Sequence, residues 1–132
     1  MKKQYFFLLI GTFVFINLNA AELKANENSL ADSATISFTE TLHDYGTIKK
    51  DSDGTYDFMF KNTGKIPLVL SNVSSSCGCT TPSWPKEPIA PGKTGVIKVK
   101  YNTAIIGGFQ KGITVYSNAK TVVITIKGSV QE

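Results

Sequence analysis

Apolar and polar residues alternate with a period of two along most of the chain after residue 34. The pattern is clear in residues 56–61, 96–101, 113–116 and 122–127. Alternation of this kind predicts antiparallel strands with one buried face and one solvated face. Turns rich in Gly, Pro, Asn and Asp separate the runs, and no run beyond the first 20 residues has a helical period. Short strands between frequent turns predict a β-sandwich or a barrel.

A set of apolar side chains in these runs is predicted to fill the space between two sheets. The set consists of Phe38, Tyr45, Phe58, Phe60, Leu68, Leu70, Val73, Ile97, Val99, Ile113, Val115, Val122, Ile124 and Ile126. Each buried side chain of this size contributes about 1.5–3 kcal/mol, and chain entropy offsets most of the total. A core of this size allows the domain to fold without a disulfide.

The beginning of the chain has the layout of a secretory signal peptide. Two lysines precede an apolar run over residues 5–18, and the small residues Ala20 and Ala21 follow it. As a helix, this run of about 14 residues would span roughly 21 Å, less than the ~30 Å hydrocarbon core of a bilayer. We therefore expect cleavage rather than a permanent membrane anchor.

Three segments follow from this interpretation. Residues 1–20 are the expected signal peptide, residues 21–34 are a polar, flexible tether, and residues 35–132 form one domain. The protein is expected in the periplasm or at the cell surface. It would meet the membrane only through the signal peptide before cleavage.

Charge argues against one class of partner. The net charge is +4, and without the two lysines of the leader 12 lysines face 10 acidic residues, which leaves +2. The chain has no arginine, the residue favoured for contacts with phosphates and base edges. Nucleic acid is therefore not an expected partner, and nothing in the composition calls for a cofactor.

The two cysteines lie one residue apart in Ser76-Cys77-Gly78-Cys79-Thr80, which is predicted to be a loop between strands. Three interpretations remain open. A disulfide could close a tight bend, with Gly78 at positive φ, and a small, strained ring of this kind would suit a redox role. The two thiolates could instead bind a soft metal such as Cu(I). Alternatively, the cysteines are structural and either pack as small apolar side chains or oxidise without function.

Other polar and aromatic residues have simpler interpretations. His43, the single histidine, is predicted to be a strand-edge residue, and Asp51-Ser52-Asp53-Gly54 to be a hairpin turn. Trp84 lies in a stretch whose prolines keep it extended. This side chain either covers one end of the core or is an exposed anchor for a partner, since Trp is enriched in binding hot spots.

Five segments carry motifs in a recognisable order: H-D-Y-G-T-I (43–48), F-K-N-T-G-K-I-P-L-V-L (60–70), S-S-C-G-C-T (75–80), I-A-P-G-K-T-G (89–95) and Y-S-N (116–118). Together they resemble a family of exported bacterial domains known as domain of unknown function 1573. Tyr45 stands where this family usually has Phe. The resemblance implies an all-β, immunoglobulin-like sandwich of about seven to eight antiparallel strands, similar to major-sperm-protein and abnormal-spindle/hydin domains. Those relatives are chiefly protein-interaction modules, and no biochemical activity is implied for the family itself.

These observations lead to two functional hypotheses. The first is an exported, non-enzymatic module that binds a protein or a glycan in the bacterial cell envelope through its sheet edges or the Trp84 segment. The second is a thiol redox or copper-handling protein that uses Cys77 and Cys79, with Ser76, Gly78 and Thr80 shaping the loop.

Overall fold

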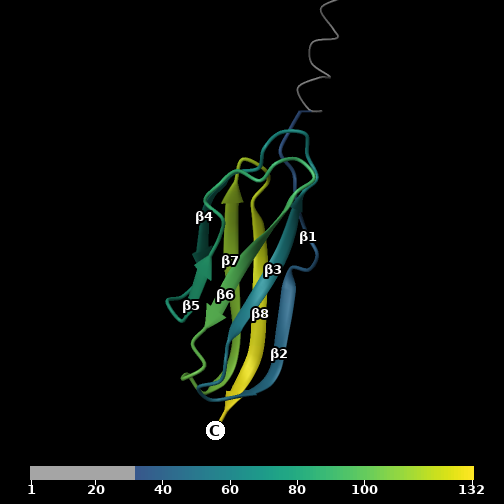
Figure 1. Ribbon diagram of the computed structural model, residues 1–132. Helices are drawn as coiled ribbons and strands as arrows, with labels where there is room; N and C mark the ends of the chain where they lie inside the picture. The colour runs from purple at the N-terminus through teal and green to yellow at the C-terminus, as the bar shows by residue number, and fades with distance from the viewer. Residues whose placement is uncertain (1–31) are drawn as a thin grey trace, which may run out of the picture.

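The computed structural model describes residues 32–132, in which eight strands form two packed sheets (Figure 1). The first sheet has the strand order β1 (Ile36–Phe38), β3 (Thr55–Asn62), β6 (Thr94–Tyr101) and β5 (Thr80–Ser83). The second sheet has the order β2 (Leu42–Lys49), β8 (Val122–Gln131), β7 (Gly107–Ser117) and β4 (Leu70–Ser75). The predicted all-β, immunoglobulin-like sandwich is confirmed.

One pair of strands departs from the antiparallel prediction. β2 and β8 run parallel, whereas the other paired strands of the two sheets are antiparallel. The cause lies between β1 and β2, where the chain changes sheets without reversing. Thr39 N donates to Met59 O in the first sheet, and Thr41 O accepts from Thr125 N in the second. The chain therefore reaches β8 running in the same direction as that strand.

The inner faces of both sheets form one hydrophobic core. Eleven of the predicted core residues are buried: Phe58, Phe60, Leu68, Leu70, Val73, Ile97, Val99, Ile113, Val115, Ile124 and Ile126. Three others, Phe38, Tyr45 and Val122, are half-buried against this core. Five further residues complete it: Ala34, Ile36, Tyr101, Phe109 and Val130. The alternation of the strands therefore identified most of the residues that face inward.

Two residues of the segment expected to be a tether have contacts with the domain. Ala34 is 7% exposed, and Ser33 O accepts a hydrogen bond of 3.0 Å from Lys65 N. Gly64 permits this approach, because a Cβ there would lie 2.6 Å from Thr35 N. The expected signal peptide, its cleavage site and residues 21–31 of the expected tether lie outside the described residues. Residues 32–132 contain no helix capable of crossing a membrane.

The segment Asp51–Gly54 is not the hairpin turn that its sequence predicts. It carries the chain from β2 in the second sheet to β3 in the first, and these two strands do not pair. Hydrogen bonds fix this crossing from both sides: Tyr45 Oη donates to Gly54 O at 2.7 Å, and the Thr103 hydroxyl donates to Ser52 O. Asp and Gly favour a chain reversal of either kind, so the local sequence did not distinguish a hairpin from a crossing between sheets.

Candidate functional site

The cysteine loop, residues 75–80, joins β4 of the second sheet to β5 of the first. Both strands are at the edges of their sheets and lie together at one side of the sandwich (Figure 1). Cys77 and Cys79 form a disulfide, with their Cα atoms 5.4 Å apart. A disulfide is compatible with a redox role and with a structural one. The surroundings of the two sulfur atoms distinguish these roles.

Gly78 does not use the conformation that the sequence analysis invoked for the bend. The described glycines with positive φ are Gly46, Gly92 and Gly107, and Gly78 is not among them. A Cβ built on Gly78 would also have no atom within 4 Å. The loop therefore closes without a left-handed residue, and it leaves open space around its central position.

Hydrogen bonds from outside the disulfide hold the backbone of the cysteine loop. Ser75 Oγ lies within hydrogen-bond distance of the carbonyl oxygens of Cys77 and Thr80. Ser76 N donates to Gly112 O in β7 at 3.0 Å, and Asn102 N donates to Cys79 O at 2.8 Å. Because these bonds anchor both ends of the loop to neighbouring strands, the loop has fixed attachments that do not involve sulfur.

The two sulfur atoms have different surroundings. Cys79 N donates a hydrogen bond of 3.2 Å to Cys77 Sγ, whereas Cys79 Sγ lies 3.8 Å from the hydroxyl of Thr80. An N–H directed at a sulfur stabilises negative charge on it. Both cysteines are half-buried. Of the two sulfurs, Cys77 Sγ is therefore better placed to become a thiolate.

The disulfide adds little stability to the fold through chain entropy. It closes a ring between residues separated by two positions. In the loop-closure model, a ring this small restricts the unfolded chain by about 1.5 kcal/mol, against about 3 kcal/mol for a 15-residue loop. The core described above does not depend on such a contribution.

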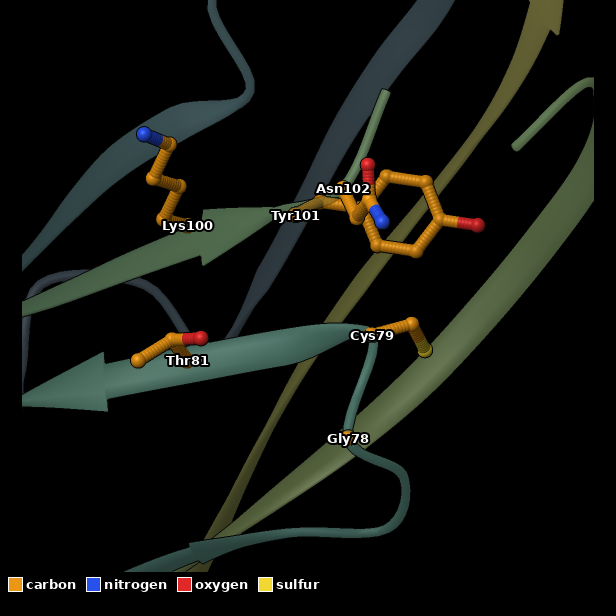
Figure 2. Close-up of a pocket in the computed structure, with 6 residues that line it drawn as sticks. All are labelled: Gly78, Cys79, Thr81, Lys100, Tyr101 and Asn102. Atoms are coloured by element: carbon orange, nitrogen blue, oxygen red, sulfur yellow. The ribbon is translucent and has the colours of Figure 1, made fainter. Parts of the chain in front are cut away.

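A shallow hollow of about 310 Å³ borders the loop. It is lined by Gly78, Cys79, Thr81, Lys100, Tyr101 and Asn102 (Figure 2). In this view the side chains of Cys79 and Tyr101 extend to the side opposite the Lys100 side chain (Figure 2). Burial raises the pKa of Tyr101, whose ring stacks on Phe109 with centroids 3.7 Å apart. Tyr101 is a buried core residue, so it closes the inner side of the hollow near Cys79, and Lys100 lies on the solvent-exposed side.

In the part of the chain that the structure describes, the cysteines have no third metal ligand. Among residues 32–132, no group of three or more His, Cys, Asp or Glu side chains is arranged to hold a metal ion. His43 lies on β2, at the opposite edge of the second sheet from β4. Its ring stacks on Tyr56 at 3.4 Å and meets Tyr45 edge-on at 4.6 Å. Soft-metal binding at Cys77 and Cys79 would therefore rest on the two sulfurs alone, and it stays a prediction.

Trp84 follows β5 and is half-buried against the core. The ammonium of Lys86 lies 3.0 Å from the centroid of its ring, which is a cation–π contact. The ring therefore has both of the features weighed from the sequence: it covers part of the core, and it keeps some exposed surface. A role of Trp84 in binding a partner stays a prediction.

Three of the other motifs have evident structural roles. In H-D-Y-G, Gly46 has φ of 63° and its N donates to Asp44 Oδ1 at 2.8 Å. At the end of β3, the buried Asn62 amide donates to Ile66 O and Ile89 O. In Y-S-N, Asn118 Nδ2 donates to Pro67 O at 3.0 Å, and Asn118 Oδ1 accepts from Val69 N at 2.9 Å. In the cysteine motif, Cys79 Sγ lies 3.8 Å from the hydroxyl of the buried Thr80, and Cys77 Sγ accepts from Cys79 N, so the contacts of both sulfurs stay within the loop.

The outer faces of the two sheets differ in chemistry. On the second sheet, the apolar side chains of Leu42, Tyr116 and Val123 are 47%, 43% and 55% exposed. On the first sheet, the solvent-facing positions of β3 and β6 include Lys61, Lys98, Lys100, Met59 and Val96. Sequence reasoning did not identify the apolar set, because its members come together only through the register of β2, β8 and β7.

These features define a PapD-like, immunoglobulin-like sandwich with a disulfide at one edge. The chain belongs to the family described as protein of unknown function (DUF1573), whose model matches residues 36–130. A search of curated proteins found no match.

Solved structures support the fold. A protein of unknown function from Porphyromonas gingivalis W83 has a TM-score of 0.67 at 18% identity; the match covers 75% of this chain and 48% of that one, so this chain spans about half its length. The ASH/PapD-like domain 7 of human CEP192 has a TM-score of 0.65 at 10% identity, covering 76% and 87%. The CsuC–CsuE chaperone–tip adhesion subunit complex from Acinetobacter baumannii gives 0.54 at 12%, covering 74% and 58%. At these identities the likeness establishes the fold alone.

Proposed function

We propose that this chain is an exported, non-enzymatic module that binds a protein partner in the bacterial cell envelope. The observation that carries the proposal is an apolar patch on the outer face of the second sheet. We define this patch as Leu42, Thr114, Tyr116, Val123 and Thr125. Its three large apolar side chains are each more than two-fifths exposed.

The register makes the patch continuous. Thr125 pairs with Leu42 on β2, and Val123 pairs with Thr114 on β7. Tyr116 lies two residues beyond Thr114 and therefore diagonally opposite Val123, within reach of a large side chain. Other large apolar side chains are exposed as well, among them Met59, Val96, Ile105 and Ile106, but the patch lies across three paired strands. Contiguous apolar surface of this kind is typical of an interaction site.

The chemistry of the patch favours a protein over a glycan. A flat arrangement of aliphatic, aromatic and methyl-bearing side chains offers apolar contact area and few hydrogen-bonding groups. The charged pair nearest to it, Lys127 and Asp44 with their charged atoms 3.8 Å apart, is exposed at the border, as in the polar rim of many interfaces. The PapD-like fold of the A. baumannii chaperone, whose structure is a complex with an adhesion subunit, is a further support.

The non-enzymatic part of the proposal rests on how polar groups are used. His43 is held between the rings of Tyr45 and Tyr56. Asp53, whose pKa is lowered by hydrogen bonds from Thr55, orders the start of β3. These groups serve the fold, and none of them lines the hollow beside the cysteine loop.

Site-specific photocrosslinking in the native bacterium tests the proposal. A photoreactive residue at Val123 should give a discrete adduct with an envelope protein, and Leu42→Glu should abolish it without unfolding the domain. The matched control places the same residue at Val96, which is exposed on the other sheet, and should not give this adduct. Absence of an adduct from position 123, or equal adducts from both positions, contradicts the proposal.

Fractionation and N-terminal sequencing of the same cells test export. Mature protein beginning near residue 21 in the periplasm or at the surface is the expected result. Retention of the full-length chain in the cytoplasm would contradict it. Binding to purified envelope polysaccharide that survives Leu42→Glu would favour the glycan alternative.

A further inference from the structure

We propose that the Cys77–Cys79 disulfide is an exchange site that oxidises a pair of cysteine thiols on a partner protein. This activity would replace the non-enzymatic part of the proposed function, and it does not depend on binding through the apolar patch, because the patch and the cysteine loop are carried by different residues.

First, the loop keeps its attachments when the sulfur–sulfur bond breaks. The bonds from Ser76 N to Gly112 O and from Asn102 N to Cys79 O connect its two ends to β7 and to the end of β6. Gly78, between the cysteines, has no neighbour within 4 Å of a built Cβ. A disulfide that serves to hold the fold would be expected to bridge distant segments, whereas this one joins residues two positions apart.

Second, the hydrogen bonding gives the exchange a direction. A thiolate of the partner attacks Cys79 Sγ, the Cys77–Cys79 bond breaks, and the bonding electron pair leaves on Cys77 Sγ. The Cys79 N–H, 3.2 Å from that sulfur, stabilises the thiolate as it forms. Leaving groups of lower thiol pKa depart faster.

The second half of the reaction balances the electrons. The other thiolate of the partner attacks the partner's own sulfur in the mixed disulfide, and Cys79 leaves as a thiolate. The thiolates of Cys77 and Cys79 then take up protons from solvent. The partner loses two electrons and gains a disulfide, while the Cys77–Cys79 pair gains two electrons and becomes a dithiol.

Third, the hollow provides an approach to one sulfur-bearing residue and not to the other. Cys79 lines it, together with Lys100, Tyr101 and Asn102, and Cys77 does not (Figure 2). Lys100 adds a positive charge to the rim of the hollow, which favours thiols carried next to acidic groups. Cys79 is half-buried against the core, so the hollow brings a partner to this residue, and the better leaving group, Cys77, makes Cys79 the sulfur that is attacked.

The first experiment uses the purified, oxidised full chain in native buffer. Dithiothreitol should reduce the disulfide within minutes, as measured by acid quenching, alkylation and intact-mass spectrometry. Trp84 fluorescence and circular dichroism should remain those of the folded protein. A disulfide that resists excess dithiothreitol until denaturant is added, or a reduced chain that unfolds, would overturn the proposal.

A second experiment tests the direction with single-cysteine variants. Cys79→Ser keeps Cys77 and the backbone N–H at position 79, whereas Cys77→Ser keeps Cys79 without that donor. At pH 7 the Cys79→Ser variant should alkylate at least about 3-fold faster, and its rate should reach half-maximum at a lower pH. Equal rates, or faster alkylation of Cys77→Ser, would show that the sulfurs are not differentiated as proposed.

A third experiment tests the hollow with small thiols of opposite charge. Lys100→Gln should slow reduction by glutathione, which is anionic, about 2-fold, and should leave reduction by cationic cysteamine unchanged or faster. Lys61→Gln, on the same outer face but outside the hollow, is the matched control and should change neither rate. Loss of both rates in Lys100→Gln, or no change in either, would contradict the assigned approach.

Discussion

The chain passes twice from the second sheet to the first, and the two crossings are built in opposite ways. The crossing from β2 to β3 is packed and closed: Gly54 lies against Tyr101 O, and hydrogen bonds from Tyr45 and Thr103 hold it. The crossing from β4 to β5 is open around Gly78 and carries a disulfide on its surface. Both crossings make the same topological connection, so topology alone does not require a disulfide there. The presence of two cysteines in this crossing is therefore not explained by the topology of the fold.

The largest effect is expected from Gly54→Ala in the closed crossing. The added Cβ would overlap Tyr101 O and lie 2.8 Å from Thr103 Cγ2. Because a backbone atom of β6 cannot move away without disturbing its strand, we expect a loss of about 3 kcal/mol in the free energy of unfolding. Urea denaturation followed by Trp84 fluorescence measures it. A loss below 1 kcal/mol, on the order of an ordinary surface change, would mean that the closed crossing is more adaptable than its contacts indicate.

A smaller effect is expected from the double variant Cys77→Ala, Cys79→Ala in the open crossing. Loss of a ring this small should reduce the free energy of unfolding by about 1.5 kcal/mol or less, because the backbone hydrogen bonds to Gly112 and from Asn102 remain. Urea denaturation under the same conditions gives the comparison. A loss of 3 kcal/mol or more, of the size seen when a structural disulfide is removed from a small domain, would make the two crossings equivalent.

The sequence predicted which residues are buried, but it did not predict how the strands are connected. Alternation at Phe58, Phe60, Ile97 and Val99 predicted which faces are buried, so the sandwich could be expected before the structure. Parallel and antiparallel strands both show an alternation of apolar and polar residues with a period of two. The parallel pairing of β2 with β8 was therefore not predicted. Similarly, a turn signal such as Asp-Gly does not state whether the next strand joins the same sheet.

The candidate sites show the same limit. The spacing of Cys77 and Cys79 allowed a disulfide, and the structure adds the donor at Cys79 N and the hollow beside it. Neither addition follows from residue types, because the hydrogen bond depends on the conformation of the loop and the hollow depends on how the loop meets β6. The apolar patch likewise required the register that places Leu42 and Val123 on one face.

A further effect is expected from Tyr45→Phe, which removes one hydroxyl from the closed crossing. Loss of its bond to Gly54 O should cost about 1 kcal/mol at neutral pH. Burial, and secondarily the charge of Asp53, raise the pKa of Tyr45 from 10.0 to about 12. The folded state therefore favours the protonated phenol. This contribution is complete below pH 10 and is lost as the pH rises from 10 to about 12.

The pH dependence separates this hydroxyl from general packing. Thermal unfolding between pH 8 and 12 should show a shallower alkaline decline for Tyr45→Phe than for the parent. Tyr101, whose pKa is also raised by burial, remains in both proteins and accounts for the decline that persists. Identical slopes would show that the Tyr45 hydroxyl ionises equally in the folded and unfolded chains.

The smallest effect is expected from Gly78→Ala, the counterpart of Gly54→Ala in the open crossing. No atom lies within 4 Å of the added Cβ, and the φ of Gly78 is not positive, so an alanine fits without displacing a neighbour. The free energy of unfolding should change by no more than about 0.5 kcal/mol, and the disulfide should still form, as intact-mass spectrometry would show. A loss approaching that of Gly54→Ala would mean that the glycine is needed to form the ring. A near-neutral result would instead show that the conformation of this loop depends on its two sulfurs and their hydrogen bonds, and not on a glycine at position 78.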